Sequence, residues 1–126
     1  MIHHFLSTEA YWSLNVSKET VIRSIEHSLC FGVYKDSEQV GFARVISDYA
    51  TIAYLGDVFI LEAHRGQGLS KLLMKAIMNH ANLQGLRRWI LLTGDAHDLY
   101  KKYGWTELAD STVWMERHDN DVYQQA

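Results

Sequence analysis

The sequence has no proline, a single cysteine and no apolar run of the roughly 20 residues that a membrane-spanning helix needs. Because Cys30 is alone, no disulfide can form within the chain, and a reducing compartment fits. A basic excess is also missing, since 12 Lys and Arg stand against 15 Asp and Glu. This balance argues against a general nucleic-acid binder. The first residues, MIHHF, lack the features of a secretory signal. We therefore expect a cytoplasmic protein without membrane or nucleic-acid partners.

What is present points to one ordinary globular domain. The 126 residues contain no low-complexity segment or fixed-period repeat, and they are too few for two domains. Apolar residues make up 48% of the chain and charged residues 21%, values typical of soluble proteins. We expect residues 1–126 to form a single domain whose polar end, 119–126, is frayed.

The N-terminal half predicts a strand, a helix, a hairpin and another strand. Residues 2–7 read as a short opening strand, and Ser17 is a suitable N-cap for a helix that runs to about residue 29. Two β-rich runs around Asp36-Ser37-Glu38 predict an antiparallel hairpin with a short polar loop. The largely apolar run 51–60 predicts a central strand.

The C-terminal half begins with a glycine-rich segment and a helix. Apolar positions then follow helical spacing up to Ala81: Leu69, Leu72, Leu73, Ala76, Ile77, His80 and Ala81. Gly85 marks a stop, and RRWILLT, residues 87–93, predicts a buried strand. A short helix follows, with Asp95 as its cap and Gly104 at its end.

Two closing strands complete the expected order. They are WTELA, residues 105–109, and TVWMER, residues 112–117. The order β, α, ββ, β, α, β, α, ββ predicts a mixed α/β domain with a mostly antiparallel sheet. A strand–loop–helix–strand crossover lies in its middle.

The glycine-rich segment has the features of an anion site. The first amides of a helix have no partner inside it, and the helix dipole favours negative charge there. Gly66 and Gly68 allow the backbone to approach a phosphate closely, while Arg65 and Lys71 add positive charge. A P-loop would need Gly-Lys-Ser/Thr after four residues, and a Rossmann fingerprint would need glycine where Lys71 stands. Both common nucleotide motifs therefore fail on spacing.

A different family fits two segments of the chain. RGQGLS, residues 65–70, resembles the R/Q-x-x-G-x-G/A signature of the GNAT superfamily of N-acetyltransferases, and AHDLYKKYGW, residues 96–105, resembles its A-x-x-L-Y-x-K-x-G-F segment. The resemblance covers roughly residues 30–116. It implies a GNAT-like fold, although the N-terminal part has room for one good helix where the family commonly has two.

The resemblance also implies how acetyl-CoA is bound. The turn would hold the pyrophosphate through backbone amides, and the strand before it would present its main chain to the pantetheine arm. The cofactor-binding residues implied are Val58, Phe59, Ile60, Arg65, Gly66, Gln67, Gly68, Leu69, Ser70 and Lys71.

Acetyl transfer to an amine needs a neutral amine, a stabilised tetrahedral intermediate and a proton for the departing thiolate. Tyr100 aligns with the tyrosine to which many family members assign that proton donation. Asp57, in an apolar strand, is a candidate to accept the amine's proton or to attract a cationic amine; alternatively it is tied to the backbone or to Arg44. Asp48 and Tyr49 are candidates to line the acceptor mouth.

The other reactive side chains favour structural roles. His64 and His97 are more often surface or capping residues than bases, and the seven histidines show no zinc-site spacing, so we expect no metal. Cys30 reads as a core residue. The resemblance implies an acetyl-CoA-dependent N-acetyltransferase that acts on a small-molecule or peptide amine, and the lack of an activated cysteine favours direct transfer. The alternative is a non-catalytic acyl-CoA-binding module. Many members of the family form homodimers, and nothing in the sequence fixes the oligomeric state.

Overall fold

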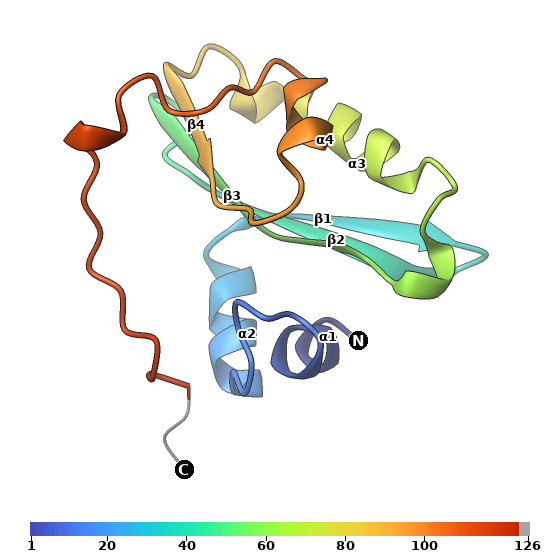
Figure 1. Cartoon of the computed structure of the whole chain (residues 1–126). Coiled ribbons are helices and arrows are strands. Elements are labelled where there is room, and N and C mark those ends of the chain that lie inside the picture. Colours follow the sequence, from blue (N-terminus) through green and yellow to red (C-terminus); the bar gives the residue numbers. More distant parts are fainter. Residues whose placement is uncertain (124–126) are drawn as a thin grey trace. The chain divides into compact units, whose positions relative to one another are not determined.

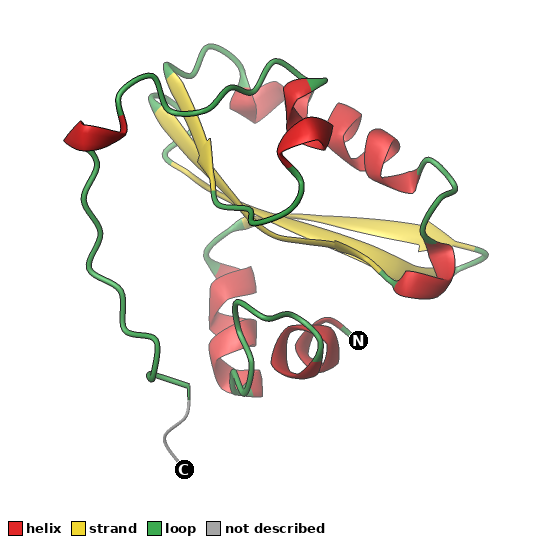
Figure 2. Cartoon of the chain, viewed as in Figure 1, coloured by secondary structure: helices red, strands yellow, loops and turns green. Residues whose placement is uncertain are grey.

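A four-stranded sheet with the order β1-β2-β3-β4 forms the centre of the first 92 residues (Figures 1 and 2). Strand β2 is antiparallel to both β1 and β3, and β4 is parallel to β3. The strands are Leu29–Lys35, Glu38–Ser47, Ile52–Ile60 and Arg88–Leu91. The expected mixed, mostly antiparallel sheet with β3 in its interior is confirmed.

The computed structural model describes residues 1–123 and contains two compact units, Met1–Leu92 and Thr93–Ala126. Of the end that the sequence predicts to fray, residues 120–123 form a turn. Residues 124–126 lie outside the described part of the chain.

Two helices precede the sheet, where the sequence predicts a strand and one helix. Residues 2–7 lie in α1, Ile2–Thr8, and the predicted opening strand is therefore wrong. Phe5 and Leu6 are adjacent and both buried, which suits one side of a helix, whereas successive strand residues would point to opposite faces. The ring of Phe5 stacks on that of Phe59 at 3.9 Å and docks α1 on the sheet.

The second helix, α2, spans Lys18–Glu26 and begins as predicted. The Ser17 hydroxyl accepts a hydrogen bond from the Thr20 amide at 3.2 Å, which satisfies one of the amides at the helix start. With α1 present, the expectation of a single N-terminal helix is also wrong, and the chain has both helices before its sheet.

The predicted hairpin is confirmed between β1 and β2. Its turn consists of Asp36 and Ser37, with φ angles of 52° and 70°. Two successive residues in the left-handed region match the right-handed twist of the flanking strands and fix their register. Lys35 and Glu38 therefore face each other at the end of the ladder.

Helix α3, Leu69–Met78, lies on the face of the sheet opposite α1 and α2 (Figure 1). Leu73, Met74 and Ile77 are buried, as the helical spacing predicts. The helix is shorter than expected, because the His80 ring accepts a hydrogen bond from the Asn82 amide and starts a separate 3-10 turn, Ala81–Leu83.

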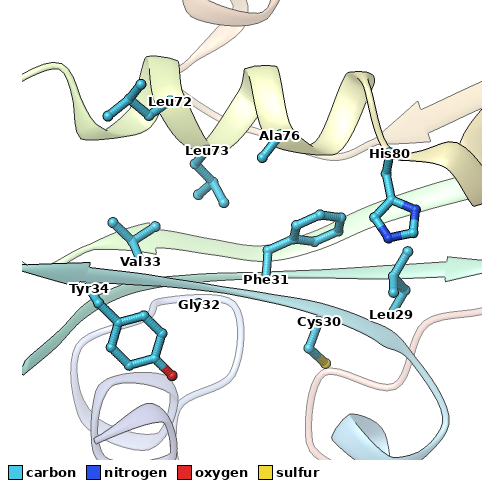
Figure 3. Close-up of a pocket in the computed structure, with 10 residues that line it drawn as sticks. All are labelled: Leu29, Cys30, Phe31, Gly32, Val33, Tyr34, Leu72, Leu73, Ala76 and His80. Carbon is cyan, nitrogen blue, oxygen red and sulfur yellow. The ribbon is translucent and has the colours of Figure 1, made fainter. Parts of the chain in front are cut away.

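An open groove of about 460 Å³ lies between α3 and the edge strand β1 (Figure 3). Figure 3 shows Phe31 and Val33 pointing toward α3, while Cys30 and Tyr34 point to the opposite side of the strand. Cys30 therefore belongs to the face of the sheet that carries α1 and α2.

The second unit contains α4, His97–Lys101, and an irregular segment after it. Asp95 does not cap this helix; Ala96 occupies the cap position, and its amide donates to the Thr93 hydroxyl at 3.1 Å. The predicted end is confirmed, since Gly104 has a φ of 88° and its amide bonds to the Lys101 carbonyl.

The two predicted closing strands, 105–109 and 112–117, are wrong for the described residues. Asp110 accepts a hydrogen bond from the Thr112 amide at 3.0 Å and caps a 3-10 turn, Ser111–Val113, which includes the start of the second segment. Val113 and Met115 are 72% and 96% exposed, so the alternating pattern buries no face. A short strand without a buried face has little to stabilise it.

Candidate active site

The glycine-rich turn lies between β3 and α3 and has an open backbone surface. Gly66 and Gly68 have φ angles of 77° and 79°, and a Cβ placed on either would meet no atom within 4 Å. Gly68 is the N-cap of α3, and the first helical hydrogen bond there runs from the Leu72 amide to the Gly68 carbonyl at 3.2 Å. The amides of the first turn precede that bond and have no acceptor within the helix. The turn is a cradle that an anion can fill.

Strand β3 leads into this turn, and its pairing with β4 ends before the turn begins. Pairing with β4 runs from Ile52 to Leu55 and stops there, whereas β3 continues to Ile60 beside β2. The edge of residues 56–60 that would face β4 is therefore not part of the β3–β4 ladder. An extended ligand chain can hydrogen-bond to such an edge.

The same stretch contains a β-bulge. Phe42 faces Phe59 and Arg44 faces Gly56, so β3 has one residue more than β2 between these pairs. Asp57 lies in the bulge with a φ of 53°. Bulges of this kind change the direction of a side chain and often lie next to active sites.

The candidate cofactor residues divide into buried and exposed groups. Phe59 and Ile60 are buried, so their side chains are not available to a ligand. The Arg65 side chain is turned back on the strand, and its Nε donates to the Ile60 carbonyl at 2.9 Å. Gln67 and Lys71 are exposed. Gln67 accepts a hydrogen bond from Lys35, a residue outside the two GNAT-like segments.

Asp57 is held by two side chains. Its Oδ2 accepts from Arg44 Nε at 2.8 Å and its Oδ1 from Trp12 Nε1 at 3.1 Å. The Arg44 and Asp57 side chains are 16% and 14% exposed. Arg44 also donates from Nη1 to the Ser28 hydroxyl at 3.1 Å. The tie to Arg44, one of the alternatives for Asp57, is present, and it offsets the cost of placing this carboxylate in a mostly buried position.

Tyr100 lies in α4 and is 8% exposed. Its ring packs at 5.9 Å from that of Trp105, and the Trp105 amide donates to the Tyr100 carbonyl at 3.3 Å. Burial and then the negative charge of Asp95 raise the pKa of Tyr100 above the ordinary value of 10.0. The phenol therefore holds its proton at neutral pH, as a proton donor must.

Comparison with known proteins supplies the family. The family model described as the acetyltransferase (GNAT) family matches residues 1–105. The chain belongs to the GNAT family of acetyltransferases. A candidate GNAT acetyltransferase of Xanthomonas campestris pv. campestris has a crystal structure that matches with a TM-score of 0.96 and 53% identity. That match covers 98% of this chain and 87% of the other.

More distant relatives agree with this GNAT assignment. A candidate acetyltransferase of Gibberella zeae is 33% identical over 117 residues, which cover 76% of this chain. The chain spans 65% of the length of that relative. A GNAT acetyltransferase of Elizabethkingia anophelis, crystallised with acetyl-CoA bound, has the same fold at 19% identity, with a TM-score of 0.57. That match covers 69% of this chain and 60% of the other.

In this GNAT chain Cys30 lies near the Asp57 cluster as a free thiol. Burial raises the pKa of the Cys30 thiol, and the charge of Arg44 opposes that effect. A thiol with a raised pKa is a poor nucleophile, because the thiolate is the attacking form. Burial and the charge of Asp57 also raise the pKa of Tyr54.

Asp48 and Tyr49, the candidates to line the acceptor mouth, lie in the connection between β2 and β3. Asp48 accepts from the amides of Ala50, Thr51 and Ile52, and these bonds, led by that of the Thr51 hydroxyl, lower the pKa of Asp48. It therefore caps the β2–β3 turn, next to Tyr49, whose φ is 61°.

Neither histidine candidate has the hydrogen-bonded setting of a general base. His64 lies in the 3-10 turn Glu62–His64, and its buried Nδ1 has no hydrogen-bond partner among residues 1–123. His97 is exposed, with Nε2 at 3.1 Å from the Thr93 carbonyl.

Residues 1–123 contain neither a metal-binding cluster nor a membrane-spanning helix. Within that range no group of three or more His, Cys, Asp or Glu side chains has a metal-holding arrangement. The helices described there are also all too short or too polar to cross a membrane.

Proposed function

We propose that this GNAT chain is an acetyl-CoA-dependent N-acetyltransferase that moves the acetyl group directly to a primary amine. The open glycine cradle between β3 and α3 is the observation that carries the proposal. Both glycines have left-handed backbones and free space at the position of a side chain, which suits a pyrophosphate. The acetyl-CoA bound to the relative from Elizabethkingia anophelis supports the same co-substrate.

Binding would use two parts of the first unit. The amides around Gly66 to Lys71 would hold the pyrophosphate, with Arg65 and Lys71 adding positive charge. The main chain of Val58, Phe59 and Ile60 would pair with the amides of the pantetheine arm, because β4 does not pair with this part of β3. The acyl group would then lie near the bulge at Asp57.

The reaction would proceed without an acetylated enzyme. The amine nitrogen attacks the thioester carbonyl carbon and forms a C–N bond, and the C–S bond then breaks. Asp57 takes the proton that the amine loses, directly or through water. Tyr100 gives a proton to the departing thiolate and is reprotonated from solvent. The raised pKa of Cys30 supports direct transfer, since the thiol is a poor alternative nucleophile.

Replacing Asp57 tests its role toward the amine. We expect Asp57→Asn to lower kcat/KM for the amine roughly tenfold, while the Kd of acetyl-CoA stays unchanged. Arg44 already offsets the carboxylate charge, which keeps the effect below the usual contribution of a general base. The measurement is initial-rate kinetics by thiol release, with calorimetry for the Kd.

Asp36→Asn is the matched control for this variant. Asp36 also has a left-handed backbone, with a φ of 52° against 53° for Asp57, and asparagine tolerates that conformation equally well. Unchanged kcat/KM in Asp57→Asn would leave this carboxylate with a structural role in the cluster of Arg44 and Trp12.

One observation favours a second candidate, an acyl-CoA-binding module without turnover. Both oxygens of Asp57 already accept hydrogen bonds, so the carboxylate is partly committed before any amine arrives. Both functions predict that the protein binds acetyl-CoA, but only the enzyme transfers the acetyl group to an amine.

The test combines calorimetry with an amine screen. We expect micromolar binding of acetyl-CoA, no binding of a dinucleotide, and thiol release with at least one small-molecule or peptide amine. Binding without thiol release across the screen would support the module. Absence of acetyl-CoA binding would overturn both functions.

The proposal also includes the domain boundaries of the enzyme and its cellular compartment. The family match over residues 1–105 includes all of the first unit and the start of the second, which supports one GNAT domain over residues 1–126. The free thiol of Cys30 fits the cytoplasm, where thiols stay reduced.

A further inference from the structure

Lys35 reaches the glycine-rich turn from a distant part of the sequence. It is the last residue of β1, next to the hairpin turn, and its Nζ lies 2.5 Å from Oε1 of Gln67, 32 positions later. In Figure 1 the hairpin end of β1 and β2 lies beside the segment that leads into α3. Gln67 stands between Gly66 and Gly68, so the ammonium is hydrogen-bonded to a side chain of the glycine-rich turn.

The contact pairs Lys35 with a neutral group. Lys35 takes part in neither of the ion pairs Arg44–Asp57 and Lys101–Glu107. Gln67 is a neutral acceptor and takes one of the three N–H groups of the ammonium. Glu38 faces Lys35 across the hairpin without forming an ion pair. Two N–H groups of the ammonium remain for a ligand.

The chemistry at this point matches a phosphate group. Arg65 directs its Nε to the Ile60 carbonyl, so part of its hydrogen-bonding capacity is used within the protein. Lys35 supplies a compact charge with rotatable donors, which suits a phosphate oxygen. An anion in the cradle would then meet backbone amides from α3 and a cation from the hairpin.

We propose that Lys35 binds the pyrophosphate of acetyl-CoA and that Gln67 positions its ammonium. This inference rests on the proposed function and adds a binding residue outside the GNAT signature. If Lys35 binds the pyrophosphate, the β1–β2 hairpin contributes to the affinity for acetyl-CoA although none of its residues belongs to the GNAT signature.

The test is calorimetry of Lys35→Ala with three ligands. For acetyl-CoA and 3′-dephospho-acetyl-CoA we expect about tenfold weaker binding than in the unaltered protein, as for one charge-assisted hydrogen bond at an exposed site. S-acetylpantetheine, which has no pyrophosphate, should bind both proteins equally.

Two more variants sharpen the result. Lys75→Ala removes an equal charge from an exposed position further along α3 and should leave all three affinities unchanged. Gln67→Glu should weaken acetyl-CoA binding by a similar factor to Lys35→Ala, because the new carboxylate would pair with Lys35. Because Lys35 is exposed at the hairpin end, we expect the alanine variant to fold normally, and circular dichroism checks this.

The other outcomes are distinct. Equal acetyl-CoA affinity in Lys35→Ala and the unaltered protein would overturn this inference and leave the proposed function intact. A loss confined to acetyl-CoA, with 3′-dephospho-acetyl-CoA unaffected, would overturn the pyrophosphate assignment and move Lys35 to the 3′-phosphate. If the unaltered protein bound no acetyl-CoA, the proposed function would fail and this inference with it.

Discussion

Gly68→Asp is expected to abolish acetyl-CoA binding. Gly68 has a φ of 79°, a conformation that residues other than glycine rarely adopt, and a Cβ there would enter open space at the start of α3. Aspartate would place a carboxylate there, against the phosphate charges of the ligand. Charge repulsion, backbone strain at the start of α3 and the space taken by the new side chain would all weaken acetyl-CoA binding. We expect the Kd to rise by at least about 10³-fold, beyond the range of calorimetry, since like charges at close range cost several kcal/mol.

Gly85→Asp is the control that separates the effect of backbone strain from the effect of a negative charge in the glycine-rich turn. Gly85 has a φ of 74° and equally open space around its Cβ position, and it lies in the connection before β4. This variant should carry similar backbone strain and keep its acetyl-CoA affinity. Normal binding by Gly68→Asp would mean that the turn is only the start of a helix and that the cradle assignment is wrong.

Tyr100→Phe is expected to lower kcat about 10²-fold while the Kd of acetyl-CoA stays the same. The substitution removes the hydroxyl and keeps the ring that packs against Trp105. Tyr103→Phe, one turn later in the chain, is the matched control and should retain full activity. Equal turnover of Tyr100→Phe and the unaltered protein would remove Tyr100 from the mechanism and favour the binding module.

The pH dependence of kcat gives an independent measure of the same group. Burial and Asp95 raise the pKa of Tyr100 above 10.0, so the acid form persists through neutral and moderately alkaline pH. The rate should fall when the pH rises through this raised pKa, and the falling limb should be absent in Tyr100→Phe. The raised pKa also means that the folded state loses stability in this alkaline range, so circular dichroism at each pH must accompany the rates.

Local features of the site were predictable because short segments determine them. The Ser17 cap, the Asp36–Ser37 turn and the glycine turn each depend on a few adjacent residues with strong backbone preferences. The apolar spacing of α3 likewise lies within a single helix, which packs its apolar side against one core. These elements were expected from the sequence and are present.

Other features depend on partners far away in the chain. Residues 2–7 form a helix because Phe5 stacks on Phe59, and six residues are too few to separate a strand pattern from a helical one. Trp12 meets Asp57 across 45 positions, and Lys35 meets Gln67 across 32. No local pattern marks such pairs. The predicted strands at 105–109 and 112–117 are wrong because an alternating pattern alone does not form a strand. Two of their apolar side chains, Val113 and Met115, are exposed.

The two-residue turn at Asp36 and Ser37 makes the connection between β1 and β2 intolerant of changes in length. Adding or removing one residue would shift β1 against β2, and such a shift moves every side chain to the other face of the sheet. Phe31 and Val33 would leave the α3 side, and Lys35 would lose its position at Gln67. Length variation in this fold should therefore concentrate in other connections, such as residues 79–87 between α3 and β4.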